Sequence, residues 1–319
     1  MFRSGLFPVC LGFLTLAVVA CDPKPAAPEA PRKLLEERVD TACAAYQQYS
    51  ARFQEREGLS IELFESSNCW IAAELALAQK PGDRVQALRD YVDRSRTLEQ
   101  SVRAVRACEF REIDAAGYYV VNAEIRLQEA GGESKGREHK PTKELLAERV
   151  RAARSSFEGY MVQYRSQEGL GVEFFGWSER WLDAELSALE KPAQRAQALR
   201  NHLDRTRLVE RIAAEYARQG DREVEVTAAT WYRLGAEIRL LDAGIAPDAT
   251  AAAAPETPEK LLAQRRESAR KAFEGYYAEN AAKEGFPLEL FGWSERWLDG
   301  DLSLLETRDE RIRALCHHL

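Results

Sequence analysis

The sequence contains few of the side chains that build metal sites and nucleophilic centres. Only four of its 319 residues are histidines. His317 and His318 are adjacent, so on a helix they point about 100° apart and cannot chelate an ion as a pair spaced by four would. No glycine-rich phosphate loop, nucleophile elbow or Ser/His/Asp pattern is present. The sequence therefore predicts no catalytic residue, no metal site and no cofactor.

Basic runs and strand patterns are also missing. Lys and Arg number 45 against 52 Asp and Glu, which gives a net charge of −7. Nucleic-acid binding depends on clustered Lys and Arg, so this balance argues against a nucleic-acid partner. No segment shows the period-two alternation of a half-buried strand. The fold class predicted is all-α.

Cysteine gives no disulfide framework. Cys43, Cys69, Cys108 and Cys316 have no cysteine counterparts in the other repeats described below, and their spacing matches no zinc pattern. A disulfide among the first three is one possibility, and isolated thiols are the other.

What the sequence does contain is internal repetition. The segment Phe175–Asp183, FGWSERWLD, recurs letter for letter at Phe291–Asp299. Around it the match continues without a gap at an offset of 116 residues, and a more diverged copy begins near Leu34 at an offset of 111. A fixed period of this kind indicates one structural unit that is repeated along the chain.

Glycine- and proline-rich breaks divide the chain into these units. The expected organisation is a signal peptide at 1–20, a tether at 21–31, repeat 1 at 32–130, a linker at 131–141, repeat 2 at 142–243, a linker at 244–258 and a shortened repeat 3 at 259–319.

Each complete repeat shows four amphipathic segments joined by short turns. In repeat 2 they cover about 142–168, 173–189, 192–219 and 224–241, with apolar residues at steps of three and four. Pro192 suits a first helical turn. Short turns between long helices predict elongated up-and-down bundles arranged in tandem, with helices of coiled-coil length. In repeat 3 the stripe of Phe273, Tyr276, Trp293 and Trp297 would then need cover from the preceding unit or from another molecule.

The repeated tryptophan box predicts packing rather than chemistry. On a helical wheel Trp177 and Trp181 share one face, while Glu179 and Arg180 point to the opposite, solvated face. Aromatic residues at helical spacing usually belong to a core. The predicted core aromatics of the box are Trp70, Trp177, Trp181, Trp293 and Trp297.

One acid falls inside the apolar sector in every repeat. A carboxylate among Leu and Trp side chains needs a cationic partner, or its pKa rises. The arginine ten residues further on also recurs and is the partner expected, with the arginine series Arg38, Arg149 and Arg265 as another. The candidate partly buried ion pairs are Glu74–Arg84, Glu185–Arg195 and Asp301–Arg311. The alternative is that these acids are general acids or bases in a cleft.

The N-terminus has the pattern of an export signal. Arg3 precedes an apolar run at 6–20, which is too short for a membrane span. The run ends in Val18-Val19-Ala20-Cys21, which resembles the lipobox of bacterial lipoproteins. The resemblance implies that the Cys21 sulfur carries lipid and that the mature protein is anchored to a membrane of the cell envelope. A proline-rich tether follows at 22–31.

Three functional hypotheses remain open on the sequence. The first is an envelope-anchored lipoprotein whose helical repeats bind or scaffold an unidentified protein partner, with self-association through repeat 3 as one form of this. The second is a hydrolase of cell-wall glycan or peptide that uses the repeated acids. The third is a degenerate gene product without defined activity.

Overall fold

The computed structural model describes residues 32–55, 60–105, 110–133, 142–166, 171–218, 223–246, 257–281 and 288–318. Within these ranges all regular elements are helices, eleven in number, so the all-α prediction is confirmed. None of these helices is long and apolar enough to cross a membrane. In chain order they are α1 (Arg32–Gln54), α2 (Ser60–Leu77), α3 (Pro81–Ala104), α4 (Phe110–Glu129), α5 (Thr142–Arg165), α6 (Gly171–Ala188), α7 (Pro192–Ala217), α8 (Glu223–Asp242), α9 (Pro258–Asn280), α10 (Leu288–Leu304) and α11 (Arg308–His318).

The helix boundaries repeat with the sequence. The bounds of α2 shifted by 111 residues are those of α6. The bounds of α5 shifted by 116 match the start of α9 and extend one residue past its end. α4 and α8 both have 20 residues and correspond at an offset of 113. Repeat 1 therefore contains α1–α4, repeat 2 contains α5–α8 and repeat 3 contains α9–α11. α11 corresponds to the first part of α7.

Local signals explain where these helices begin and end. Pro81, Pro192 and Pro258 stand in the first turns of α3, α7 and α9, where a missing N–H costs nothing. α4 and α8 end with the same cap. Gly131 and Gly244 have φ of 75° and 70°, a left-handed conformation that glycine adopts without a steric penalty. The next N–H in each case bonds back five residues, to Leu127 and Leu240, at 2.9 Å.

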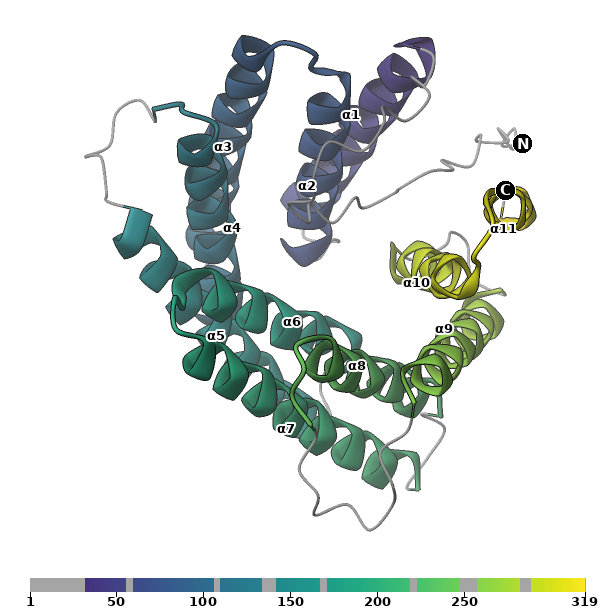
Figure 1. The fold of residues 1–319 in the computed structure, drawn as a ribbon. Helices are drawn as coiled ribbons and strands as arrows, with labels where there is room; N and C mark the ends of the chain where they lie inside the picture. Colours follow the sequence, from purple (N-terminus) through teal and green to yellow (C-terminus); the bar gives the residue numbers. More distant parts are fainter. Residues whose placement is uncertain are drawn as a thin grey trace.

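The helices pack as one continuous stack. Each helix contacts the next along the chain, and α4 packs on α5, and α8 on α9, as extensively as helices within a repeat. A single apolar cluster extends from α1 to α10. In Figure 1 the stack curves, so that α1–α2 and α9–α11 lie on the same side of the α5–α8 layer. The expected division into separate tandem bundles is not confirmed, because the contacts between repeats are as close as those within them.

The smaller apolar clusters also occur in pairs at equivalent positions. One pair lies within a repeat, between its second, third and fourth helices. Its members are Ile71, Leu88, Val92, Ala123 and Leu127 in repeat 1 and Leu182, Leu199, Leu203, Ala236 and Leu240 in repeat 2. The other pair joins two repeats. It contains Val121, Ile125 and Leu145 at the first boundary and Leu234, Ile238 and Leu261 at the second. The two boundaries are thus built in the same way.

Candidate functional site: the joint between repeats

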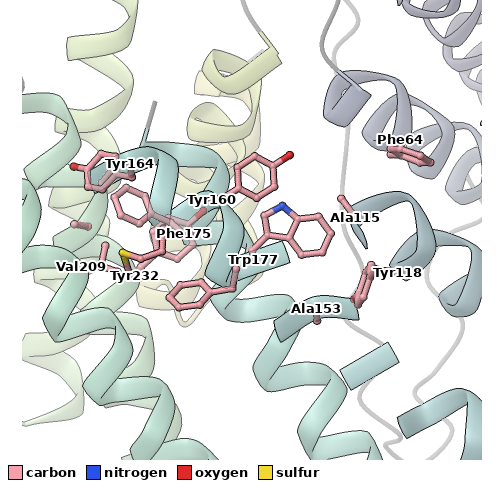
Figure 2. Packing of buried hydrophobic residues seen from close by; sticks show 14 of the residues in the cluster. Phe64, Ala115, Tyr118, Ala153, Tyr160, Tyr164, Phe175, Trp177, Val209 and Tyr232 are labelled. Atoms are coloured by element: carbon pink, nitrogen blue, oxygen red, sulfur yellow. The ribbon is translucent and has the colours of Figure 1, made fainter. Parts of the chain in front are cut away.

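The tryptophan box lies at the boundary between repeats. Trp177 of α6 is fully buried. Its ring meets Tyr118 of α4 edge-on at 5.3 Å between centroids and stacks on Tyr160 of α5 at 6.2 Å. Figure 2 shows Trp177 in the middle of this cluster, among Tyr118, Tyr160 and Phe175. Tyr118 belongs to repeat 1, so Trp177 fixes repeat 2 to the repeat before it.

The second boundary repeats this geometry. Trp293 of α10 is also fully buried. It meets Trp231 of α8 edge-on at 5.7 Å and stacks on Tyr276 of α9 at 6.2 Å. The interplanar angle of the edge-on pair is 83° at both boundaries. Aromatic pairs of this kind contribute about 0.5–1.5 kcal/mol each beyond the burial of their surface. Trp293 and Tyr276 are therefore covered by the preceding repeat, one of the two covers expected from the sequence.

An arginine accompanies each of these tryptophans. The guanidinium of Arg180 lies 4.9 Å from the Trp177 ring centre and 5.9 Å from that of Tyr119, and it donates to Glu65 of repeat 1. Glu65 also accepts a hydrogen bond from the Tyr119 hydroxyl at 2.6 Å. In repeat 3, Arg296 lies 4.7 Å from the Trp293 ring centre and donates to the Tyr232 hydroxyl at 3.0 Å.

The sequence-based placement of Arg180 on a solvated face was therefore wrong. Only 26% of its side chain is exposed, because Tyr119 of α4 and Glu65 of α2, both in repeat 1, lie against it. A helical wheel shows which residues share a face, but it does not show how many neighbours a helix has. α6 has neighbours on more than one side.

Glycines allow the helices of adjacent repeats to approach each other closely. A Cβ at Gly159 of α5 would lie 2.7 Å from Cβ of Arg111 in α4, and a Cβ at the equivalent Gly275 would lie 2.7 Å from Val224 in α8. Real Cβ atoms do not come so close, so the two helix pairs depend on glycine here. A Cβ at Gly176 would lie 2.8 Å from Nη1 of Arg180, the flexible end of a side chain on the same helix, so this glycine leaves room for the arginine.

Repeat 1 has different residues at the positions of these glycines, the buried tryptophan and the arginine. At the places of Gly159, Gly176, Trp177 and Arg180 it has Gln48, Glu65, Ser66 and Cys69. Among the described residues no helix of a preceding repeat packs on α1 or α2. We call Gly159, Gly176, Trp177 and Arg180, with their repeat 3 equivalents Gly275, Gly292, Trp293 and Arg296, the joint residues. They occur in repeats 2 and 3, each of which packs on the repeat before it, and are replaced in repeat 1.

The second tryptophan of the box has a different environment, within its own repeat. Trp181 packs on Phe157 at 5.7 Å, Trp297 on Phe273 at 5.7 Å and Trp70 on Tyr46 at 5.4 Å, with interplanar angles of 44–49°. All three are half-buried. This contact between the first and second helices occurs in every repeat, including the first.

The repeated acids have arginine partners, but not those expected. Glu74 accepts from Arg94 at 3.1 Å, and Glu185 lies 3.8 Å from Arg205, its equivalent. Both arginines also lie over a tryptophan of the box, Arg94 over Trp70 and Arg205 over Trp181, each at 3.8 Å from the ring centre. Burial raises the pKa of the Glu185 carboxyl, against the opposing effect of Arg205. Burial also lowers the pKa of Arg205, to about 10.

In repeat 3, Asp301 pairs with Arg266 of α9. The place equivalent to Arg205 would fall beyond Leu319, the last residue of this sequence.

The expected pairs with Arg84, Arg195 and Arg311 were wrong. Each of these arginines instead donates to main-chain carbonyls at the end of the preceding helix. Arg84 donates to Leu75, Arg195 to Leu186 and Leu189, and Arg311 to Leu305. A cation at a helix C-terminus satisfies carbonyls that have no intrahelical donor. The recurrence of this arginine reflects helix capping.

A serine and a histidine do come together, in the interior of repeat 2. Oγ of Ser178 lies 3.1 Å from Nδ1 of His202, and both residues are 1% exposed. Burial and the nearby Arg205 and Arg239 hold the pKa of His202 well below its usual value. A substrate has no access to this pair, so it is part of the core. Tyr91 occupies the equivalent core position in repeat 1 and is also 1% exposed.

The remaining candidates give no site. Cys43, Cys69 and Cys316 are free thiols, and Cys108 and the proposed lipid-attachment residue Cys21 lie outside the described residues. Across the described ranges no three His, Cys, Asp or Glu side chains are grouped so that they could hold a metal ion.

No protein-family model matches this sequence, and no curated protein is similar to it.

Proposed function

We propose that this protein is a lipid-anchored component of the bacterial cell envelope whose helical repeats bind or scaffold a protein partner. The observation that carries the proposal is the repeated joint. Two boundaries with the same aromatic, arginine and glycine contacts hold α1 to α10 in one fixed arrangement. Stacked repeats of this kind present a long surface in fixed register, which suits binding to other proteins.

The anchor comes from the sequence. Cys21 closes a lipobox-like segment, and the proline-rich segment at 22–31 would separate lipid from the first helix. At about 3 Å per residue such a tether spans about 30 Å. The net charge of −7 favours a protein partner over nucleic acid.

The contacts of the repeated acids support a structural role for them. Glu74 and Glu185 each lie beside an arginine that is itself stacked on a tryptophan. This arrangement uses the carboxylate to balance a half-buried guanidinium. It favours the binding module over the hydrolase alternative.

The test is crosslinking in intact cells followed by purification from membranes, with the wild type compared with Cys21→Ala. We expect the wild type in the membrane fraction, attached to a defined protein. We expect the variant, which cannot be acylated, in the soluble fraction without that partner. A wild-type protein recovered from the medium or the soluble fraction would contradict the anchor, and a membrane-bound protein with no reproducible crosslink would contradict the scaffold.

A further inference from the structure

An arginine in the first helix of repeats 2 and 3 reaches into the repeat before its own. Arg149 of α5 donates to Asn122 of α4 at 3.0 Å, and Arg265 of α9 lies 4.2 Å from the Trp231 ring centre in α8. The equivalent residue of α1 is Arg38. Among the described residues no earlier repeat packs on α1, so Arg38 must have other surroundings.

At the second boundary this arginine also faces an acid of the preceding tryptophan box. Burial lowers the pKa of Arg265, and Glu179 of α6 is the charge that opposes this most strongly. Glu179 belongs to repeat 2 and Arg265 to repeat 3. The two positions therefore pair the second helix of one repeat with the first helix of the next.

The same two positions meet once more, between repeat 3 and repeat 1. Glu295 is the equivalent of Glu179. Three charged side chains act on its carboxyl, namely Arg296 and Asp299 of its own helix and Arg38 of α1. Its Oε1 is buried although it has no hydrogen-bond partner. Repeat 3 thus takes the place of a preceding repeat towards Arg38.

Cys69 of α2 shows the same contact from the side of repeat 1. Burial raises the pKa of its thiol to about 12, Glu65 and Glu295 add to the rise, and Arg38 opposes it. Cys69 occupies the position of Arg180, the arginine that bridges the first boundary. In Figure 1 the curve of the stack brings α10 back towards α2. The second helix of repeat 3 therefore lies close to both α1 and α2.

We propose that α10 and the α1–α2 pair form a third contact between repeats, which closes the curved stack into a ring with Arg38 and Glu295 facing each other across it. In an open stack each terminal repeat has a neighbour on one side only. Closure gives repeat 1 a neighbour on both sides. The inference concerns the fold and is independent of the proposed partner.

This closing contact is looser than the two boundaries along the chain. Among the described residues α10 does not pack extensively on α1 or α2. Ser66 of α2 replaces the tryptophan that fills the other boundaries. A contact made by charged side chains without a buried aromatic ring is weak. We therefore expect the ring to open at this point before any other boundary separates.

The test reverses the charges of the pair in the full chain and uses the thiol of Cys69 as a probe. Arg38→Glu places a second acid beside Glu295 and should open the ring. Maleimide labelling of Cys69, followed by peptide mass spectrometry, should then be about tenfold faster than in the wild type, which corresponds to a shift of about 1.4 kcal/mol in the opening equilibrium. Small-angle X-ray scattering should show a larger radius of gyration.

The direction of the labelling change separates opening from a direct charge effect. An acid at position 38 would by itself keep the Cys69 thiol protonated and slow its reaction, because the thiolate is the reactive form. Faster labelling can therefore come only from exposure. Cys316 is exposed and serves as the internal standard in every sample.

The double variant Arg38→Glu/Glu295→Arg restores opposite charges and should return the labelling rate and the radius of gyration towards the wild-type values. This rescue also distinguishes opening from general loss of the fold, which a second reversal would not repair. Arg32→Glu is the matched control, since it makes the same charge change on α1 at a side chain that is 74% exposed. It should behave like the wild type.

Unchanged labelling and an unchanged radius of gyration in Arg38→Glu would overturn the proposal. A double variant that stays as reactive and as expanded as Arg38→Glu would also overturn it, because the two side chains would then not face each other. So would equal effects of Arg32→Glu and Arg38→Glu, since the change would then follow net charge and not the contact.

Discussion

Repeat 1 and repeat 2 have the same four helices, but only repeat 2 has the joint residues. Trp177 and Arg180 of repeat 2 correspond to Ser66 and Cys69 of repeat 1, while Trp181 corresponds to Trp70. The residue retained in both repeats packs within the repeat, and the residues that differ pack across the boundary. Differences between copies of a repeat thus separate the contacts that fold a unit from those that connect it to its neighbour.

The largest loss of stability is expected when the tryptophan at the boundary between repeats is removed. Trp177→Ala deletes a completely buried ring that touches both repeats, and we expect a loss of about 3–5 kcal/mol in the free energy of unfolding. Trp70→Ala, at the contact within repeat 1, should cost less because Trp70 is half-buried. Urea unfolding followed by circular dichroism measures both.

The pattern of unfolding carries further information. If Trp177 holds the repeats together, Trp177→Ala should also lower the denaturant slope or split the transition, because the two repeats would no longer unfold as one unit. Equal losses for Trp70→Ala and Trp177→Ala, with one sharp transition in each, would contradict the distinction between the two tryptophans.

The glycines provide the next test. Gly159→Ala places a methyl group 2.7 Å from Arg111, so helix α4 must move, and we expect a net loss of about 1–3 kcal/mol despite the better helix propensity of alanine. Gly117→Ala is the matched control. It also lies within a helix, but its nearest neighbour is 4.0 Å away, so it should be neutral or stabilise by about 0.5–1 kcal/mol. A stabilising Gly159→Ala would show that the boundary does not need close helix approach. Thermal unfolding of the two variants decides this.

The sequence predicted the helices well because their information is local. Pro192, the apolar steps along each segment and the glycine-rich breaks suffice to locate helix ends to within a few residues. The burial of Trp177 was also predictable, since a repeated aromatic on an apolar stripe rarely faces water.

The predictions that were wrong concerned contacts between side chains on different helices. Arg195 and Arg205 both recur as Arg84 and Arg94, and only the crossing of α6 with α7 decides that Arg205 meets Glu185. The position of Arg180 depends on Glu65 of α2 and Tyr119 of α4, which lie in another repeat. The sequence does contain a signal for the contacts between repeats. Gln48, Ser66 and Cys69 of repeat 1 together replace residues that repeats 2 and 3 share. These substitutions indicate that Trp177, Arg180 and Gly159 serve one common purpose.

Substitution of the repeated acid should lower the free energy of unfolding by a smaller amount. Glu185→Gln leaves Arg205 without its anionic partner in a site where each side chain is at most 20% exposed. We expect a loss of about 1 kcal/mol, below the usual cost of breaking a buried pair because the two groups are 3.8 Å apart. Glu74→Gln should cost more, because Glu74 accepts a hydrogen bond from Arg94 at 3.1 Å. Loss of a hydrolytic activity with unchanged thermal stability would instead support a catalytic acid.

The smallest expected effect is a dependence of stability on pH that arises at one carboxyl group of repeat 3. Glu295 of α10 has a buried Oε1 without a hydrogen-bond partner, and burial raises its pKa to about 7, with Asp299 adding to the rise and Arg296 and Arg38 opposing it. The folded protein therefore binds a proton at Glu295 more tightly than the unfolded chain does.

Stability from this group is then fully present below the unfolded pKa of about 4.5 and is lost as pH rises towards 7. Glu295→Gln should raise the melting temperature at pH 8 by about 2–4 °C and leave it unchanged near pH 4.5. A similar pH profile for the wild type and Glu295→Gln would mean that water reaches this carboxylate, and that α10 is covered less closely than α6.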